Sequence, residues 1–173
     1  LGALMRNAID LGRFDDSTRW ADEALSIYAA QGDFSINPAA VNSSAIVLAM
    51  AGRVEEARVL VERAAKFRAA RKGAVFGIPY NAMARAVIAV AAGNPDDARA
   101  AHEESQMHFA RMGMVVEAAS GQFLLAHVIL RSSADAMRSW ARSLLQAARE
   151  TFERIGFSRY VQEIDRLLAE AQA

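Results

Sequence analysis

Apolar residues recur every three or four positions along most of the chain, which is the period of an α-helix that buries one face. One clear stripe comprises Val54, Ala57, Val61, Ala64 and Phe67. A second comprises Met137, Trp140, Leu144, Ala148, Phe152 and Ile155. Alternation with period two, the signal of a strand, is not sustained anywhere, so the pattern predicts an all-α protein.

Glycine turns divide the helical segments at a regular period. Gly12, Gly52 and Gly93 lie 40 and 41 residues apart, and each is followed by any residue, an apolar residue or proline, and two acids. Glycine ends a helix in the left-handed conformation at little cost, and acids are favoured in the first turn of the next helix. Each motif therefore predicts a tight turn between two helices.

A second set of glycines has the same period. Gly32, Gly73, Gly113 and Gly156 are spaced by 41, 40 and 43 residues. An aromatic residue precedes three of the four by four positions. Two independent markers with one period indicate an internal repeat of about 40 residues. We expect each repeat to be a helix, a tight turn, a second helix and a looser connection.

This pattern predicts an antiparallel helix-hairpin solenoid of four hairpins and a capping helix, in a single domain over residues 1–173. The repeats lie near 1–34, 35–73, 74–113 and 114–156, and the cap covers 158–171. The first helix of each repeat is expected at 1–11, 38–51, 79–92 and 115–130. The second is expected at 15–31, 54–72, 95–112 and 134–155, the last of them about a turn longer than the others.

The chain resembles tetratricopeptide-type helical repeats. The resemblance rests on a small residue in the middle of the first helix (Ala45, Ala86), the glycine turn, and a small residue early in the second helix (Ala57, Ala98). The segment 148–156, Ala-Arg-Glu-Thr-Phe-Glu-Arg-Ile-Gly, is similar to the C-terminal repeats of bacterial LuxR-type transcriptional regulators and adenylate-cyclase-linked signalling ATPases. Ser17 and the segment 131–135, which lacks glycine, depart from the repeat pattern.

The resemblance implies a cytoplasmic module of a bacterial regulatory protein, and we expect the chain to be a fragment of that protein. The family's groove is lined by the first helices of the hairpins. Carried onto this chain, its positions are Asn42, Ile46, Met50, Tyr80, Met83, Val87, Phe123, His127 and Arg131. A peptide segment or small effector is the expected ligand. The alternatives are that several of these side chains are core, or that the surface mediates homodimerisation or docking on a parent ATPase or cyclase domain.

Composition narrows the function further. The formal net charge is +0, which argues against nucleic acid or an anionic membrane as the main partner. The chain has no cysteine, which excludes disulfides and thiol catalysis, and no apolar run reaches the length of a membrane span. Much of the 53% hydrophobic fraction is alanine, the best helix former.

No catalytic or cofactor signature stands out, so we expect a non-enzyme without cofactor or metal. His102, His108 and His127 lack the spacing of a metal pair, and we expect them on the surface or in the groove. In each pair of adjacent acids, the two side chains point about 100° apart around the helix. The two carboxylates of a pair therefore cannot act on the same substrate atom. The basic cluster over 66–72 lies near a helix C-terminus, where the helix dipole stabilises cations. The alternative is that the cluster binds a partner.

Overall fold

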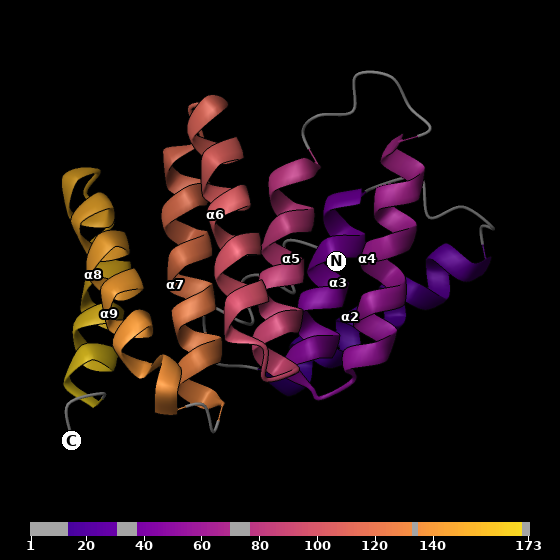
Figure 1. The fold of residues 1–173 in the computed structure, drawn as a ribbon, viewed down its shortest axis with the longest axis horizontal. Coiled ribbons are helices and arrows are strands. Elements are labelled where there is room, and N and C mark those ends of the chain that lie inside the picture. The colour runs from indigo at the N-terminus through magenta and orange to yellow at the C-terminus, as the bar shows by residue number, and fades with distance from the viewer. Residues whose placement is uncertain (1–13, 31–37, 70–76, 133–134, 171–173) are drawn as a thin grey trace. The chain divides into compact units, whose positions relative to one another are not determined.

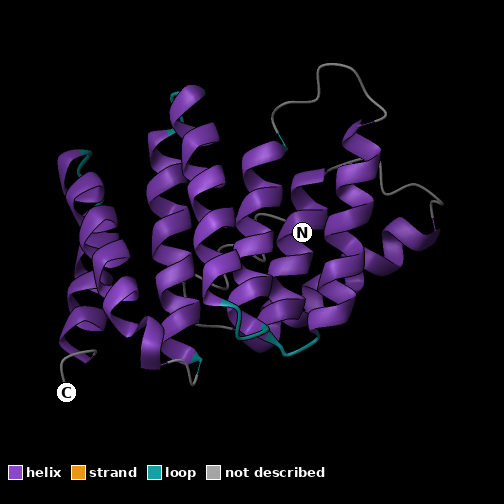
Figure 2. Ribbon diagram, viewed as in Figure 1, coloured by secondary structure: helices purple, strands orange, loops and turns teal. Residues whose placement is uncertain are grey.

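The structure is a computed structural model that describes residues 14–30, 38–69, 77–132 and 135–170. Over these residues the regular structure is entirely helical, as Figure 2 shows, which confirms the predicted all-α class. The helices are α2 (Phe14–Ala30), α3 (Pro38–Met50), α4 (Val54–Ala69), α5 (Ile78–Ala91), α6 (Pro95–Arg111), α7 (Val115–Arg131), α8 (Arg138–Arg154) and α9 (Ser158–Glu170) (Figure 1). The predicted helix at 1–11 lies outside the described residues.

The fourth repeat differs from its prediction at the start of α8. We expected one long helix from residue 134, but a short 3₁₀ helix, η1 (Asp135–Met137), precedes α8. The backbone at Ser132, which follows α7, is extended (φ −80°, ψ 156°). The segment lacks the glycine that forms the tight turns elsewhere, and 3₁₀ turns are common at helix starts. The additional turn expected at the start of this helix is therefore the 3₁₀ helix η1.

The chain forms two compact units, one up to Ser105 and one from Gln106, and each is described by itself. In the N-terminal unit, α3 contacts α2, α4 and α5. The sequence of α3 contains no charged residue, and its side chains from Ala40 to Ala49 are buried except for Ser43. A helix that is apolar all round belongs in the interior, and α3 is accordingly the centre of this unit.

The C-terminal unit is built around α8, which contacts α7 on one side and α9 on the other. Its core includes Phe123, Leu145 and Phe152, which are at most 2% exposed. The ring of Phe152 stacks on that of Tyr160 in α9, with ring centroids 4.5 Å apart. The predicted capping helix therefore packs its apolar face on α8, while Arg149 of α8 pairs with Asp165 of α9 at 2.6 Å on the outside.

The glycine turns close as the sequence predicts. Gly93 has φ +76°, its N–H donates to the carbonyl of Val90 at 3.0 Å, and the next N–H donates to the carbonyl of Ala89 at 2.9 Å. These are the two hydrogen bonds of a Schellman motif. Gly113 and Gly156 make the same bonds after α6 and α8, so the looser connection that we expected at these two places is wrong.

Replacing Gly93 tests how much this turn contributes. A Cβ at Gly93 would meet no heavy atom within 4 Å, so Gly93→Ala adds no clash. The cost is then the left-handed backbone alone, about 1 kcal/mol of the unfolding free energy. Gly93→Asn should lose less, because asparagine tolerates this conformation better. Urea denaturation followed by Trp20 fluorescence in a Trp140→Phe background measures both variants, and an alanine variant as stable as the wild type would contradict the argument.

Candidate functional site

A cavity of about 380 Å³ lies among α4, α5 and α6 in the N-terminal unit. The lining residues from α4 are Arg58, Val61 and Glu62, and those from α5 are Arg85, Ile88 and Ala89. The turn before α6 and α6 itself contribute Asn94, Asp97, Ala100, Ala101 and Glu104. A volume of this size is within the range of ligand sites in proteins.

The glycine turn determines which helix segments meet at the cavity. The tight turn at Gly93 brings the C-terminal half of α5 beside the N-terminal half of α6. The α4 lining residues, Arg58, Val61 and Glu62, come from the central part of their helix. The cavity therefore lies beside the middle of α4, the second half of α5, and α6 from its start to its middle.

The floor of the cavity is apolar and its rim is charged. Val61, Ile88 and Ala101 are only 4–5% exposed, and three of the lining side chains are alanines, which leave space above the floor. Arg85 on α5 pairs with Glu104 on α6 at 2.6 Å and joins two walls. Both side chains of this pair are about 40% exposed, so the pair contributes mainly to orientation and little to stability.

Sequence reasoning missed this cavity because its charged residues look like ordinary solvated helix faces. Glu62, Arg85 and Glu104 come from three different helices, and Arg85 and Glu104 are 19 residues apart in sequence. Only the packing of three helices brings them together. A usable sequence signal would have been the alanines at 89, 100 and 101, whose small side chains leave room at a helix contact.

The predicted groove residues do not all lie on the surface. Asn42, Ile46, Met83, Val87 and Phe123 are buried, at 6% exposure or less. Met50, Tyr80 and His127 are half-buried, and Arg131 is exposed. The buried five pack inside their own units, as the core alternative expects, and a partner could reach them only after a rearrangement. The function of the remaining four stays a prediction.

Two of the interior polar side chains meet across α3 and α5. The Asn81 side-chain amide donates to the Oδ1 atom of Asn42 at 3.2 Å and to the backbone carbonyl of Val61 at 3.0 Å. Ser105 on α6 donates to the carbonyl of Pro79, two residues before Asn81, at 2.8 Å. Buried hydrogen bonds of this kind fix the register of neighbouring helices, since a displaced helix would leave polar groups unsatisfied. Asn42 therefore acts in packing.

The three histidines have different environments. His102 on α6 is buried at 6% exposure, so the expectation that it lies on the surface or in a groove is wrong. Burial lowers the pKa of His102 to about 4, because the charged imidazolium is poorly solvated there. His127 contacts the Phe123 ring edge-on, with ring centroids 6.1 Å apart. Among the described residues, His, Asp and Glu side chains form no cluster of three or more that could hold a metal ion.

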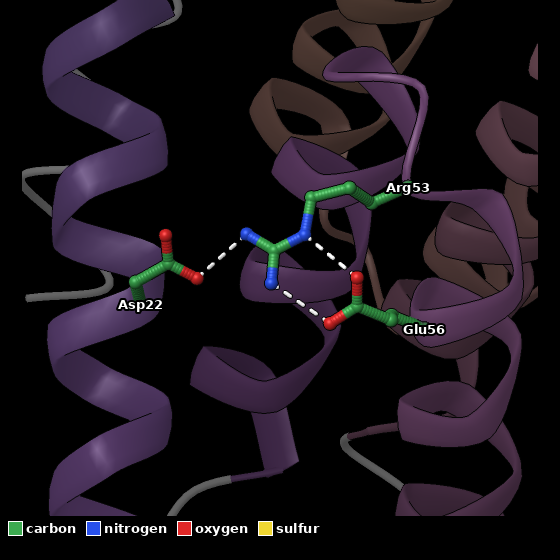
Figure 3. A network of polar contacts seen from close by, with 3 residues as sticks. All are labelled: Asp22, Arg53 and Glu56. Atoms are coloured by element: carbon green, nitrogen blue, oxygen red, sulfur yellow. Dashed lines mark hydrogen bonds and ion pairs between the residues drawn. The ribbon is translucent and has the colours of Figure 1, made fainter.

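A second polar cluster joins α2 to the turn before α4. Arg53 donates to both carboxylate oxygens of Glu56 at 2.8 Å and to Asp22 of α2 at 2.7 Å (Figure 3). The hydrogen bond to Glu56, reinforced by that to Asp22, raises the pKa of Arg53, and the same bond lowers the pKa of Glu56. Each of the three guanidinium nitrogens of Arg53 donates to a carboxylate of its own chain, so this cluster links α2 to the start of α4.

Exposed hydrophobic side chains gather at the turn between α6 and α7. Met107, Met112, Val115 and Val116 are each 37–48% exposed. They flank Gly113 within one short stretch of the C-terminal unit. Exposed apolar residues in one place are typical of an interaction surface.

The basic cluster is described only in part. Lys66 and Arg68 lie in the last turn of α4, where the helix dipole favours cations. Residues 71 and 72 lie outside the described residues. Within the described ranges, every helix is too short or too polar to cross a membrane.

Comparisons with known proteins give no relative to set beside these features: no known family matches the chain, and no curated protein matches it.

Proposed function

We propose that the chain is a non-catalytic protein-interaction module, built from tetratricopeptide-like helix hairpins and acting in the cytoplasm as part of a bacterial regulatory protein. Its partner is a peptide segment, and its site is the cavity among α4, α5 and α6. The observation that carries the proposal is the cavity of about 380 Å³ with a buried apolar floor and a charged rim. An apolar floor supplies affinity and polar groups at the rim supply orientation, which suits a short segment of another protein.

The repeat period supports the hairpin architecture in this proposal. The glycine turns recur every 40 to 41 residues at Gly12, Gly52 and Gly93, and each described turn closes a helix in the same way. Stacked hairpins leave grooves between successive helices, and partners of such arrays bind along them. The cavity differs from the groove expected from the family, because second helices of the hairpins, α4 and α6, line it together with α5.

A peptide library displayed on phage tests the proposal. Peptides selected on the purified chain should bind in fluorescence anisotropy, and Ala100→Trp should weaken them at least about tenfold, because indole would fill the cavity from an exposed wall position. Ala169→Trp, at an exposed alanine of α9, is the matched control and should leave binding within about twofold. Failure to select any peptide, or equal binding to the Ala100→Trp variant, would overturn the proposal.

A second function, homodimerisation or docking on a parent domain, is favoured by a separate observation. The apolar side chains of Met107, Met112, Val115 and Val116 are each 37–48% exposed and lie close together in sequence around the turn between α6 and α7. Methionine adapts its shape to a partner, which suits a docking surface. Light scattering on the wild type and on Val115→Asp distinguishes this function: a dimer that the aspartate converts to a monomer would support it, and a wild-type monomer would exclude homodimerisation.

A further inference from the structure

We propose that the cavity among α4, α5 and α6 recognises a basic side chain, arginine or lysine, next to an aliphatic residue of the partner segment. This inference rests on the proposed function, because it specifies the chemistry of a segment bound at that site. It is carried by the charges that line the cavity and by which of them already have partners in the chain.

The lining contains more negative than positive groups. The carboxylates are Glu62, Asp97 and Glu104, and the guanidinium groups are Arg58 and Arg85. Arg85 is neutralised by Glu104 at 2.6 Å. The Nε atom of Arg58 lies 3.5 Å from the Oε1 atom of Glu55, a residue that does not line the cavity. After these pairs are formed, the walls retain two carboxylates, Glu62 on α4 and Asp97 on α6.

Neither of these two carboxylates has a salt-bridge partner among the described residues. Arg58 and Lys66, one helical turn to either side of Glu62, make no ion pair with it in the described structure. Glu62 and Asp97 are both exposed, so their carboxylates are hydrated in the free protein. A cationic donor of a ligand can replace this water. A guanidinium group presents several donors in one plane and can serve two walls at once.

The two carboxylates should not contribute equally. Asp97 lies in the first turn of α6, where the helix dipole and free N–H groups already stabilise a negative charge. Glu62 lies in the middle of α4, away from either helix end. The helix dipole therefore stabilises the charge of Glu62 less than that of Asp97, and Glu62 should be the stronger partner of an incoming cation.

The apolar floor accounts for the second part of the ligand. Val61 and Ile88 are almost fully buried below the rim, and the alanines at 89, 100 and 101 leave space for the stem of a long side chain. Lysine and arginine bury their methylene stems on apolar surface while the charge stays at a polar rim. A neighbouring leucine or valine of the ligand would fill the remaining volume.

The test compares two capped dipeptides of nearly the same shape, one with a charged guanidinium group and one with the neutral urea group of citrulline. Acetyl-leucyl-arginine amide and acetyl-leucyl-citrulline amide are titrated into the ¹⁵N-labelled chain at low salt, and the backbone N–H signals of Ile88, Ala89 and Ala101 are followed. The arginine peptide should bind about five- to tenfold more tightly than the citrulline peptide. Raising the salt to about 0.5 M should remove most of this preference, because exposed charges are then screened.

Variants separate the two walls. Glu62→Gln should remove most of the preference for arginine, and Asp97→Asn should remove a smaller part of it. Glu103→Gln is the matched control, since Glu103 is exposed on α6 and does not line the cavity, and it should retain the preference. Equal affinity for the two peptides would overturn this inference and leave the proposed function standing. An arginine preference that survives both Glu62→Gln and Asp97→Asn would also overturn it, and binding of neither peptide at these signals would overturn both.

Discussion

Phe152→Ala is expected to lower the unfolding free energy of the C-terminal unit by about 3–5 kcal/mol. Phe152 is 0% exposed, and its ring stacks on Tyr160 of α9 at a centroid distance of 4.5 Å. Truncation removes the buried ring and leaves a cavity between α8 and α9. Because α9 contacts the described chain mainly through α8, losing this ring should also loosen the C-terminal helix.

Phe157 provides the matched control. It belongs to the same ring cluster, with its centroid 6.1 Å from that of Phe152, but it is 43% exposed. Phe157→Ala should therefore cost about 1 kcal/mol. Its backbone N–H, which donates to the carbonyl of Phe152 at 2.8 Å, is kept in the variant. The difference between the two variants isolates the effect of burial from that of losing an aromatic ring.

The measurement uses the two tryptophans of the chain, Trp20 and Trp140, which lie one in each unit. In a Trp20→Phe background, urea denaturation followed by fluorescence reports the C-terminal unit alone. If Phe152→Ala fails to fold, Phe152→Leu should fold with a smaller loss, because leucine refills part of the space. A loss of less than about 1 kcal/mol for Phe152→Ala would show that this ring is not a core element.

The helix boundaries could be predicted from sequence because their causes are local. Glycine in the left-handed conformation, proline at a helix start and acids in the first turn act within a few residues of one another. The starts of α3, α4 and α6 coincide with their predicted positions for this reason. Where these signals were missing, between α7 and α8, the prediction missed the 3₁₀ turn of η1.

The surface could not be predicted equally well, because exposure depends on contacts between distant helices. In α5, the sequence pattern did not distinguish Val87, which is 0% exposed, from a groove residue. The reason is that α5 is apolar on nearly every side and only Arg85 on it is charged, so no polar face marks the direction of solvent. The cavity was missed for the related reason that its walls come from three helices.

His102 shows the same limit for chemistry. We expected its side chain on the surface or in the groove, yet it is 6% exposed. Only the tertiary packing of α6 determines this exposure. The same packing lowers the pKa of the imidazole below its ordinary value. The buried imidazole therefore gives the stability of the chain a specific pH dependence.

The unfolding free energy of the N-terminal unit is expected to fall by about 2 kcal/mol between pH 7 and pH 5 because of His102. Burial lowers the pKa of His102 in the folded chain to about 4, from an unfolded value of 6.5. Between these two values the unfolded chain binds more protons than the folded chain. Stability is therefore fully present above the unfolded pKa, is lost as the pH falls toward 4, and reaches a total loss of about 3 kcal/mol below it.

His102→Gln removes this titration and should abolish the loss between pH 7 and pH 5, whatever its effect on stability at pH 7. The measurement is urea denaturation at each pH in a Trp140→Phe background, so that Trp20 reports the N-terminal unit. The interval stops at pH 5 because Glu56 begins to contribute below it. The hydrogen bond to Arg53 lowers the pKa of Glu56 from 4.5, so protonation of Glu56 at lower pH also reduces the unfolding free energy. If the variant and the wild type lose equal stability over this interval, His102 is not a buried neutral imidazole, because only such a group makes the folded chain resist protonation.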